Sequence, residues 1–224
     1  MSPGLGRVTA MSGVFVVFEG GDGAGKSTQS RLLAGALREL GHEVVETREP
    51  GGTAVGEAIR EVLLGAGSEG MAARTEALLF AAARAEHAAA LIRPALERGA
   101  VVVSDRYLDS SVAYQGAARG LGEQRIADLS RWATEGLVPE LTVLLEVDPS
   151  VGLHRAGDAN RMEAEPAAFH AEVRAAFLRQ ASAEPQRYLV LSAQRPREEI
   201  AEAVLASVLE RIVRAGAESP GVSA

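Results

Sequence analysis

Cysteine is absent from this chain of 224 residues, which excludes disulfide bonds, thiolate metal sites and a cysteine nucleophile. Long apolar runs are absent too. The longest alanine-rich stretch, residues 76–92, contains Arg84 and Glu86, so no membrane-spanning segment is expected. Residues 1–10 lack the apolar core of a signal peptide. These absences predict a soluble protein of a reducing compartment, and we expect the cytoplasm.

Positive charge is scarce, and it is almost entirely arginine. The formal net charge is −7 and the pI is about 5.3, which disfavours a protein that coats DNA or RNA. Lys26 is the only lysine among the 23 basic residues. A single lysine predicts a place where a compact ammonium group is needed and a planar guanidinium does not fit. Random composition bias is the alternative interpretation.

Short apolar runs alternate with helical patterns along the chain. The predicted strands are residues 14–19, 43–47, 100–104, 141–147 and 188–191. The predicted helices are residues 26–40, 55–64, 74–98, 109–117, 123–135, 167–183 and 198–213, with one more starting near residue 149. Strands that are apolar on both faces and alternate with helices predict an α/β fold, in which a parallel sheet is covered on both sides.

The length suits a single domain, which we place at residues 13–214. Residues 1–12 are expected to form a flexible extension and residues 215–224 a flexible C-terminal tail. A polar loop is expected at about residues 156–165.

The strongest motif is GGDGAGKS at residues 20–27, which matches G-x-x-x-x-G-K-[ST] between a predicted strand and a predicted helix. Glycines let main-chain N–H groups turn toward a phosphate, and the start of the helix adds positive potential. Lys26 is predicted to reach the β- and γ-phosphates, Ser27 to bind Mg²⁺ and Thr28 to contact the α-phosphate. The predicted ATP-binding residues are Gly20, Gly21, Asp22, Gly23, Ala24, Gly25, Lys26, Ser27 and Thr28.

Two other classes of P-loop protein are disfavoured. The guanine-binding motif of GTPases needs a second lysine, and the chain has none. Partition-type ATPases carry an extra lysine early in the loop, where Gly21 and Asp22 stand here. Small-molecule kinases and simple ATPases remain.

An acceptor site is predicted where the strands end, because ligands of open α/β sheets bind at the carboxyl ends of the strands. Arg48 follows the second predicted strand and Arg106 the third, so both are candidates to bind an acceptor phosphate. Asp105 is placed like a carboxylate that organises Mg²⁺. Ordinary ion pairs are the alternative interpretation of all three residues.

Each of two sets of three side chains lies on one face of a predicted helix. They are Phe80, Arg84 and His87 on one helix and Ser111, Tyr114 and Gln115 on the next. An aromatic ring beside an arginine suits a pyrimidine base, with Phe80 stacking and Arg84 donating to a carbonyl. A core position is the alternative for Phe80, and His87 is expected to be structural.

Five segments match one known family in order and at similar spacing. They are FEGGDGAGKST, TREPGGT, LLFAAAR, SDRYLDSSVAYQG and ARG. Over about residues 14–213 the chain therefore resembles the bacterial thymidylate kinases, a family of P-loop nucleoside-monophosphate kinases. The resemblance implies a five-stranded parallel sheet with helices on both faces and a short mobile lid. It also implies a homodimer that transfers the γ-phosphoryl group of Mg·ATP to dTMP, giving dTDP.

The resemblance assigns roles at the matching positions. Arg48 and Arg106 would hold the dTMP phosphate, and Asp22 would accept a hydrogen bond from the 3′-hydroxyl. Phe80 would stack on thymine and Arg84 would donate to its O4. The remaining dTMP-binding residues would be Ser111 and Gln115, which meet the base edge, and Tyr114, which crowds the 2′ position and so favours deoxyribose.

Arg155 and Arg161 resemble the lid arginines of the family, and catalytic roles are implied for them together with Asp22, Lys26, Arg48 and Arg106. Ala24 stands where some members have a catalytic arginine, so the lid would stabilise the charge on the transferring phosphoryl group. Asn160 departs from the pattern, because relatives often have an acid there. Residues 191–196 match weakly the family's loop beside the adenine.

Two rival functions stay open. A kinase for another nucleotide or for a deoxynucleoside is the nearer one, and a deoxynucleoside kinase would use a carboxylate base such as Glu19 or Glu49 beside a 5′-hydroxyl. A non-catalytic P-loop protein is the rival from a different class. It would bind ATP and transfer no phosphate.

Overall fold

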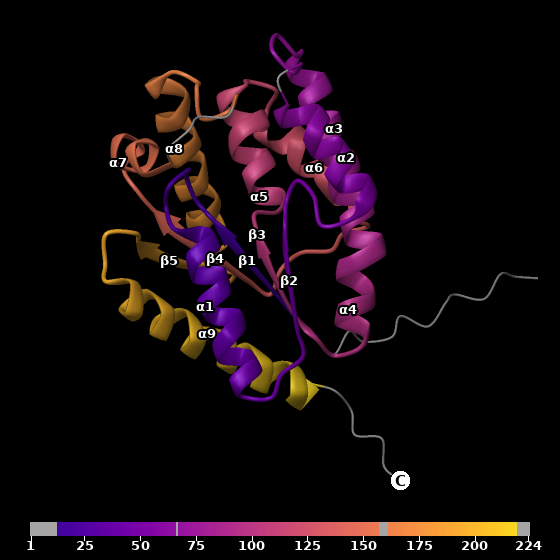
Figure 1. Cartoon of the computed structure of the whole chain (residues 1–224), viewed down its shortest axis with the longest axis vertical. Helices are drawn as coiled ribbons and strands as arrows, with labels where there is room; N and C mark the ends of the chain where they lie inside the picture. Colours follow the sequence, from indigo (N-terminus) through magenta and orange to yellow (C-terminus); the bar gives the residue numbers. More distant parts are fainter. Residues whose placement is uncertain (1–12, 66, 157–160, 219–224) are drawn as a thin grey trace, which may run out of the picture.

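Five parallel strands form the centre of the molecule, in the order β2–β3–β1–β4–β5 (Figure 1). The computed structural model describes residues 13–65, 67–156 and 161–218, except for the side chains of residues 153, 155, 156, 217 and 218. The strands are β1 (Val14–Glu19), β2 (Val44–Arg48), β3 (Val101–Asp105), β4 (Leu141–Glu146) and β5 (Tyr188–Ser192). The expected five-stranded parallel sheet is confirmed.

Helices connect and cover the strands. The α-helices are α1 (Lys26–Glu39), α2 (Ala54–Leu64), α3 (Ala73–His87), α4 (Arg93–Glu97), α5 (Leu108–Ser111), α6 (Glu123–Ala133), α7 (Pro149–Ala156), α8 (Ala167–Ala183) and α9 (Arg197–Glu218). Two π-helical segments also occur, η1 (Ala88–Ile92) and η2 (Val112–Ala118). The expected extension at residues 1–12, the end of the tail and Asn160 lie outside the described residues.

Two predicted helices are interrupted. The helix expected over residues 74–98 is divided into α3, η1 and α4. Pro94, at the start of α4, has no N–H to donate to the preceding turn, and that turn is the wider π-helical segment η1. The helix expected over residues 109–117 is divided into α5 and η2. In η2 the backbone approaches α6 closely, because a Cβ at Gly116 would lie 2.9 Å from the Cα of Glu123. The last helix, α9, continues to Glu218, beyond its expected end at Val213.

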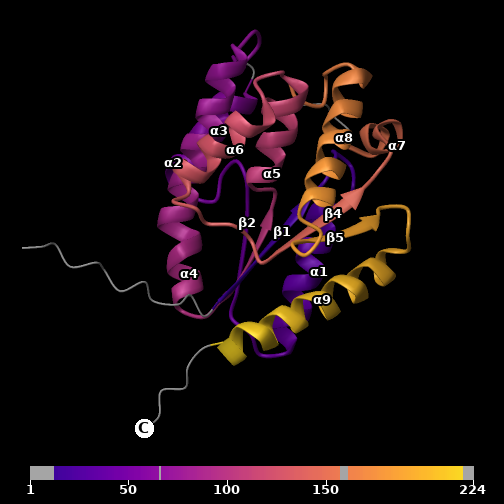
Figure 2. The ribbon, with the colours of Figure 1, turned by 180° about the vertical axis from the view of Figure 1, so that it is seen from behind.

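Alternate residues of β1 enter two separate cores. Val16 packs with Leu37 of α1 and Val204 of α9 on one face of the sheet. Phe15 packs with Ile92 of η1 on the other face. Burial on both faces explains why this strand is an unbroken apolar run. Helices α2, α3 and α6 lie side by side farther from the strands (Figures 1 and 2).

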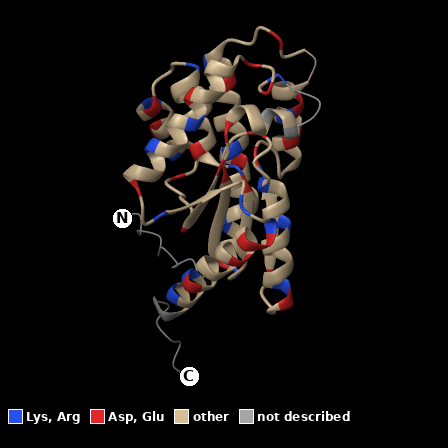
Figure 3. Ribbon diagram, turned by 90° about the vertical axis from the view of Figure 1, so that its left-hand side faces the viewer, with Lys and Arg blue, Asp and Glu red and all other residues tan. Residues whose placement is uncertain are grey.

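The parallel arrangement brings the carboxyl ends of β1, β2 and β3 to one edge of the sheet. The segments that begin at Gly20, Glu49 and Arg106 leave the sheet there. Figure 3 shows basic and acidic residues interspersed along the surrounding helices. Among the described helices, none is both long and apolar enough to cross a membrane.

Candidate active site

A cavity of about 350 Å³ opens at this edge of the sheet. Its walls come from the phosphate loop, the segment after β2, helices α2 and α3, the corner after β3, and η2. The predicted site residues that line it are Asp22, Gly23, Lys26, Ser27, Arg48, Phe80, Arg84, Asp105, Arg106, Ser111, Tyr114 and Gln115. The candidate residues from the phosphate loop and from the acceptor site therefore share one cavity.

The phosphate loop lies between β1 and α1, as its motif predicts. Gly23 has a φ of +70°, and a Cβ there would lie 2.0 Å from the carbonyl oxygen of Gly152 in α7. The same contact restricts Gly152, where a Cβ would lie 2.4 Å from the carbonyl oxygen of Asp22. Only glycine fits at both positions, so the loop rests directly on the backbone of α7.

The single lysine lies inside this loop. Lys26 begins α1, and its Nζ donates to the carbonyl oxygen of Gly21 at 2.8 Å. Its side chain is buried, and this burial, together with the charge of Arg106, lowers the pKa of Lys26 to about 8. An arriving phosphate would favour the charged ammonium form, so this environment suits a lysine that pairs with an anion.

A hydroxyl and a carboxylate meet where β3 ends. Ser27 Oγ donates to Asp105 Oδ2 at 2.5 Å. These hard oxygen ligands are the kind that Mg²⁺ prefers, with water and phosphate oxygens completing its shell. In the described part of the chain no group of three or more His, Cys, Asp or Glu side chains is placed to hold a metal ion. Ser27 and Asp105 thus offer two oxygen ligands of a kind that fits Mg²⁺.

Arg106 lies between the phosphate loop and η2. Its Nη2 donates to Asp22 Oδ1 at 2.5 Å, and its Nη1 donates to the Gly20 carbonyl at 3.1 Å. Tyr114 Oη donates to Asp22 Oδ2 at 3.0 Å. Burial alone would raise the pKa of Asp22, but Arg106 and Lys26 reverse the effect and lower it. Asp22 is thus held as a carboxylate that can accept further hydrogen bonds.

Two further arginines face the cavity from the β2–α2 side. Arg48 Nη2 pairs with Glu57 Oε2 at 2.8 Å, and the Arg48 side chain is half exposed. Arg60 Nη1 donates to the Pro50 carbonyl at 2.9 Å. Arg48 was expected in this position. Arg60 was missed, because its only signal is a position three residues after Glu57 on the same helix.

The far end of the cavity contains Phe80 and Arg84 of α3. The Arg84 side chain is 1% exposed, and its Nε donates to Glu49 Oε2 at 2.8 Å. Its Nη2 donates to Ser111 Oγ at 2.9 Å. Glu49 is therefore engaged with an arginine, and Glu19 is buried and accepts hydrogen bonds from Tyr107 and Ser110. Both carboxylates are therefore engaged with groups of the chain, and the structure gives no support for either as the base of a deoxynucleoside kinase.

Known proteins match this chain over nearly its whole length. The family model described as thymidylate kinase matches residues 18–204. A thymidylate kinase of Clavibacter michiganensis subsp. michiganensis is 54% identical over 213 residues, covering 93% of this chain and 100% of the relative. One of Thermomicrobium roseum is 51% identical over 210 residues, covering 92% and 99%.

The chain belongs to the thymidylate kinase family. A member from Leifsonia xyli subsp. xyli is 56% identical over 197 residues, covering 86% of this chain and 93% of the relative. These comparisons confirm the resemblance seen in the five sequence segments. The roles of single residues stay predictions.

The arginine expected in a thymidylate kinase lid is engaged elsewhere. Arg161 Nη1 pairs with Glu76 Oε2 at 2.6 Å, and its Nε donates to the Leu63 carbonyl at 3.4 Å. Glu76 is fully buried and also accepts from Gln115 Nε2 at 2.8 Å. In this structure Arg161 therefore anchors the segment after residue 160 to α3 instead of facing the phosphate loop. The side chain of Arg155 lies outside the described residues.

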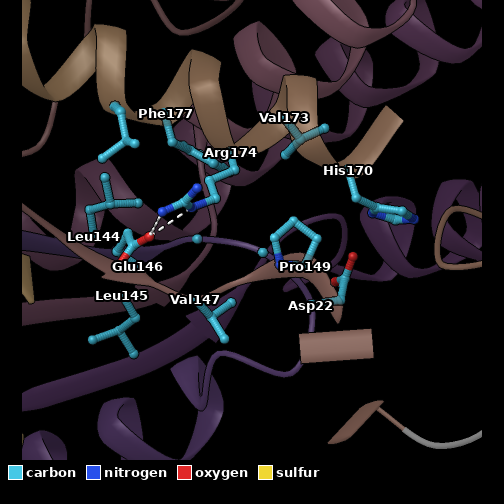
Figure 4. Close-up of a pocket in the computed structure, with 13 residues that line it drawn as sticks. Asp22, Leu144, Leu145, Glu146, Val147, Pro149, His170, Val173, Arg174 and Phe177 are labelled. Carbon is cyan, nitrogen blue, oxygen red and sulfur yellow. Dashed lines mark hydrogen bonds and ion pairs between the residues drawn. The ribbon is translucent and has the colours of Figure 1, made fainter. Parts of the chain in front are cut away.

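A smaller pocket of about 20 Å³ lies behind the phosphate loop, between β4 and α8 (Figure 4). Arg174 Nε donates to Glu146 Oε1 at 2.7 Å at its edge. His170 and Asp22 line the same pocket. Its volume holds about one water molecule, so it is too small for a substrate.

Glu19 lies beneath the site and gives this thymidylate kinase fold a titratable core. Burial, with the charge of Asp109 adding to it, raises the pKa of Glu19 to about 7 from an ordinary value of 4.5. A carboxyl whose pKa rises on folding stabilises the folded state at low pH. That stabilisation is lost as the pH rises from about 4.5 through 7.

Glu19→Gln is expected to remove this loss. We compare the difference in melting temperature, variant minus wild type, at two pH values. This difference should be about 5 °C larger at pH 8 than at pH 5. Differential scanning fluorimetry across that range measures it. Glu46→Gln, at a partly exposed position on β2, is the control and should show a constant offset. Parallel pH curves for wild type and Glu19→Gln would contradict the assignment.

Proposed function

We propose that the protein transfers the γ-phosphoryl group of ATP to dTMP and releases dTDP and ADP. Membership in the thymidylate kinase family supports this function. The single structural observation that supports it most is the shared cavity, in which the phosphate loop meets an arginine-lined wall. Residues 13–214 would form the catalytic domain, and we place the protein in the cytoplasm.

The two substrates would meet above the strand ends. ATP phosphates would lie on the loop from Gly20 to Thr28, and the dTMP phosphate would lie between Arg106 and Arg48. The thymine ring would stack on Phe80 with its O4 near Arg84 and its other edge near Ser111 and Gln115. This orientation points an oxygen of the acceptor phosphate toward the γ-phosphorus.

The reaction needs little covalent chemistry from the chain. A phosphate oxygen of dTMP forms a bond to the γ-phosphorus while the bond to the β,γ-bridging oxygen breaks, and ADP leaves with that electron pair. The acceptor is already anionic, so no general base is required. Ser27 and Asp105 would hold Mg²⁺, which when bound neutralises charge on the phosphate oxygens.

Cationic side chains supply the rest of the charge stabilisation. Lys26 would contact the β- and γ-phosphates, and Arg106 the acceptor phosphate. Asp22 would accept from the 3′-hydroxyl, and Tyr114 would lie against the 2′ position. Arg155, in the last turn of α7, is the proposed lid arginine, since Arg161 is paired with Glu76. A lid at about residues 156–165 would exclude water from the transferring group.

A coupled ADP-release assay tests the function. With Mg·ATP as donor, dTMP should be the best acceptor, ahead of dUMP, CMP and thymidine. Fastest turnover with thymidine would favour a deoxynucleoside kinase. ATP binding without phosphate transfer to any monophosphate would favour the non-catalytic rival.

We also propose that the protein is a homodimer through the face formed by α2, α3 and α6. Large apolar side chains stand exposed on these three adjacent helices, among them Val55, Val62 and Leu78. Trp132 of α6 is 80% exposed, which is unusual for a tryptophan unless a partner covers it.

Trp132→Arg is expected to weaken this dimer by about 100-fold, because buried aromatic anchors carry much of the energy of an interface. Light scattering after size-exclusion chromatography at micromolar concentration should then show the mass halved. Val213→Arg, which removes an exposed apolar side chain on α9 instead, is the matched control and should stay dimeric. A dimer in both variants would place the interface elsewhere.

A further inference from the structure

A chain of buried hydrogen bonds runs behind Arg84, away from the cavity. Glu49 Oε2 accepts from Arg84 Nε at 2.8 Å, and Glu49 Oε1 lies 3.0 Å from His87 Nδ1. His87 Nε2 in turn lies 2.7 Å from Thr47 Oγ1. The side chains of Arg84, His87 and Glu49 are each 3% exposed or less. The three groups thus form a fixed support with almost no access to water.

The chemistry of the groups sets the direction of these bonds. An ionised carboxylate only accepts, so His87 carries a proton on Nδ1 and donates it to Glu49. The other ring nitrogen, Nε2, is paired with the Thr47 hydroxyl. The backbone holds the ring from the other side, since a Cβ at Gly52 would lie 2.7 Å from His87 Nε2. His87 therefore fixes one oxygen of Glu49, and Arg84 takes the other.

Arg84 is held from several directions at once. Besides Glu49 and Ser111, its Nη1 donates to Ser130 Oγ at 3.2 Å and its Nη2 donates to the Tyr107 carbonyl at 3.3 Å. Among the described residues these contacts use four of the five guanidinium N–H groups, and one N–H on Nη1 is left for a ligand.

Charge differs between the two ends of the cavity. Arg84 and Glu49 form a neutral pair at one end. At the other, the four cations Lys26, Arg48, Arg60 and Arg106 outnumber the carboxylates Asp22 and Asp105. A neutral carbonyl group suits the first end and a phosphate the second. Glu49 and His87, which hold Arg84 at the first end, can therefore influence which base the site accepts.

We propose that Glu49, fixed by His87, is a positioning residue that sets the base selectivity of the acceptor site. It holds the Arg84 guanidinium so that its remaining N–H meets a ring carbonyl and opposes a ring amino group at the same position. This inference rests on the base placement proposed above. Glu49 itself contacts no reacting atom.

Glu49→Gln tests the proposal, because it keeps the shape and removes the charge that holds Arg84. The KM for dTMP should rise about tenfold, while kcat changes less than about threefold. The preference for dTMP over dCMP, which presents an amino group in place of O4, should fall about tenfold. The KM for ATP should stay unchanged. Glu46→Gln, on the same strand and paired with Arg38, is the matched control and should keep wild-type values.

A double-mutant cycle shows whether Glu49 acts through Arg84. In an Arg84→Ala background, Glu49→Gln should have no further effect on the preference for dTMP over dCMP. Equal and additive losses, or an unchanged preference in Glu49→Gln, would overturn the inference. If Arg84→Ala itself leaves the preference intact, the base placement is wrong, and the two failures are thereby distinguished.

Thermal melting of each variant controls for folding. Should Glu49→Gln fail to fold, Thr47→Val removes only the outermost hydroxyl of the chain. It should lower the same preference by about threefold without a change in kcat. An unchanged preference in that folded variant would likewise overturn the proposal.

Discussion

Replacing Lys26 with Met is expected to lower kcat by about three orders of magnitude or more, because it removes the ammonium group that would contact the transferring phosphoryl. The methionine keeps the length of the buried side chain, which is only 7% exposed, so the loop itself should remain folded. Steady-state ADP release at saturating dTMP, together with calorimetric ATP binding, measures the effect. The loss should fall on kcat much more than on ATP affinity.

Lys26→Arg is the informative companion variant. A guanidinium keeps the charge, but it is wider than the ammonium group that donates to the Gly21 carbonyl inside the loop. Activity should therefore be lost here as well. If either variant kept kcat within tenfold of wild type, the role of the single lysine would be refuted.

Replacing Arg106 with Ala is expected to raise the KM for dTMP by about 100-fold, since a charge-assisted pair with the acceptor phosphate disappears. The KM for ATP should rise less than about fivefold, because in the described structure the hydrogen bonds of Arg106 to the phosphate loop go to the Gly20 carbonyl and to Asp22. Initial-rate kinetics with each substrate varied in turn separates the two constants. Equal losses for both substrates would contradict the assignment.

Arg106→Gly supplies the matched control, because the backbone at this position has a φ of +71°. Alanine is strained there and glycine is not, by about 1 kcal/mol. Both variants should lose dTMP binding equally, while the glycine variant melts about 2–4 °C higher than the alanine variant. Different KM values for dTMP in the two variants would show that backbone strain, and not the guanidinium, governs the site.

Local patterns predicted the sheet and the phosphate loop well. The central strand Val14–Glu19 is an apolar run between Gly13 and Gly20, and the loop motif specifies its own strand–loop–helix context. Helix periodicity did not separate α-helix from π-helix around Ala88–Ile92, because one extra residue in a turn barely changes the apolar spacing.

The sequence patterns did not predict ion pairs between residues that lie far apart in the chain. Arg161 pairs with Glu76 across 85 positions of the chain, and nothing near either residue marks the other. Glu49 was considered only as a base. Its fixed position between Arg84 and His87 depends on two elements, β2 and α3, that meet only in the folded protein.

The paired glycines, Gly23 in the phosphate loop and Gly152 in α7, couple the position of α7 to the shape of the loop that would bind ATP. Their backbones touch with no side chain between them, so α7 cannot approach the loop and any tilt of its first turn must displace the amides that would hold ATP. A shift of α7 would therefore act directly on the main chain of the phosphate loop. Neither glycine can change alone, because any larger residue on one side would push against main chain on the other.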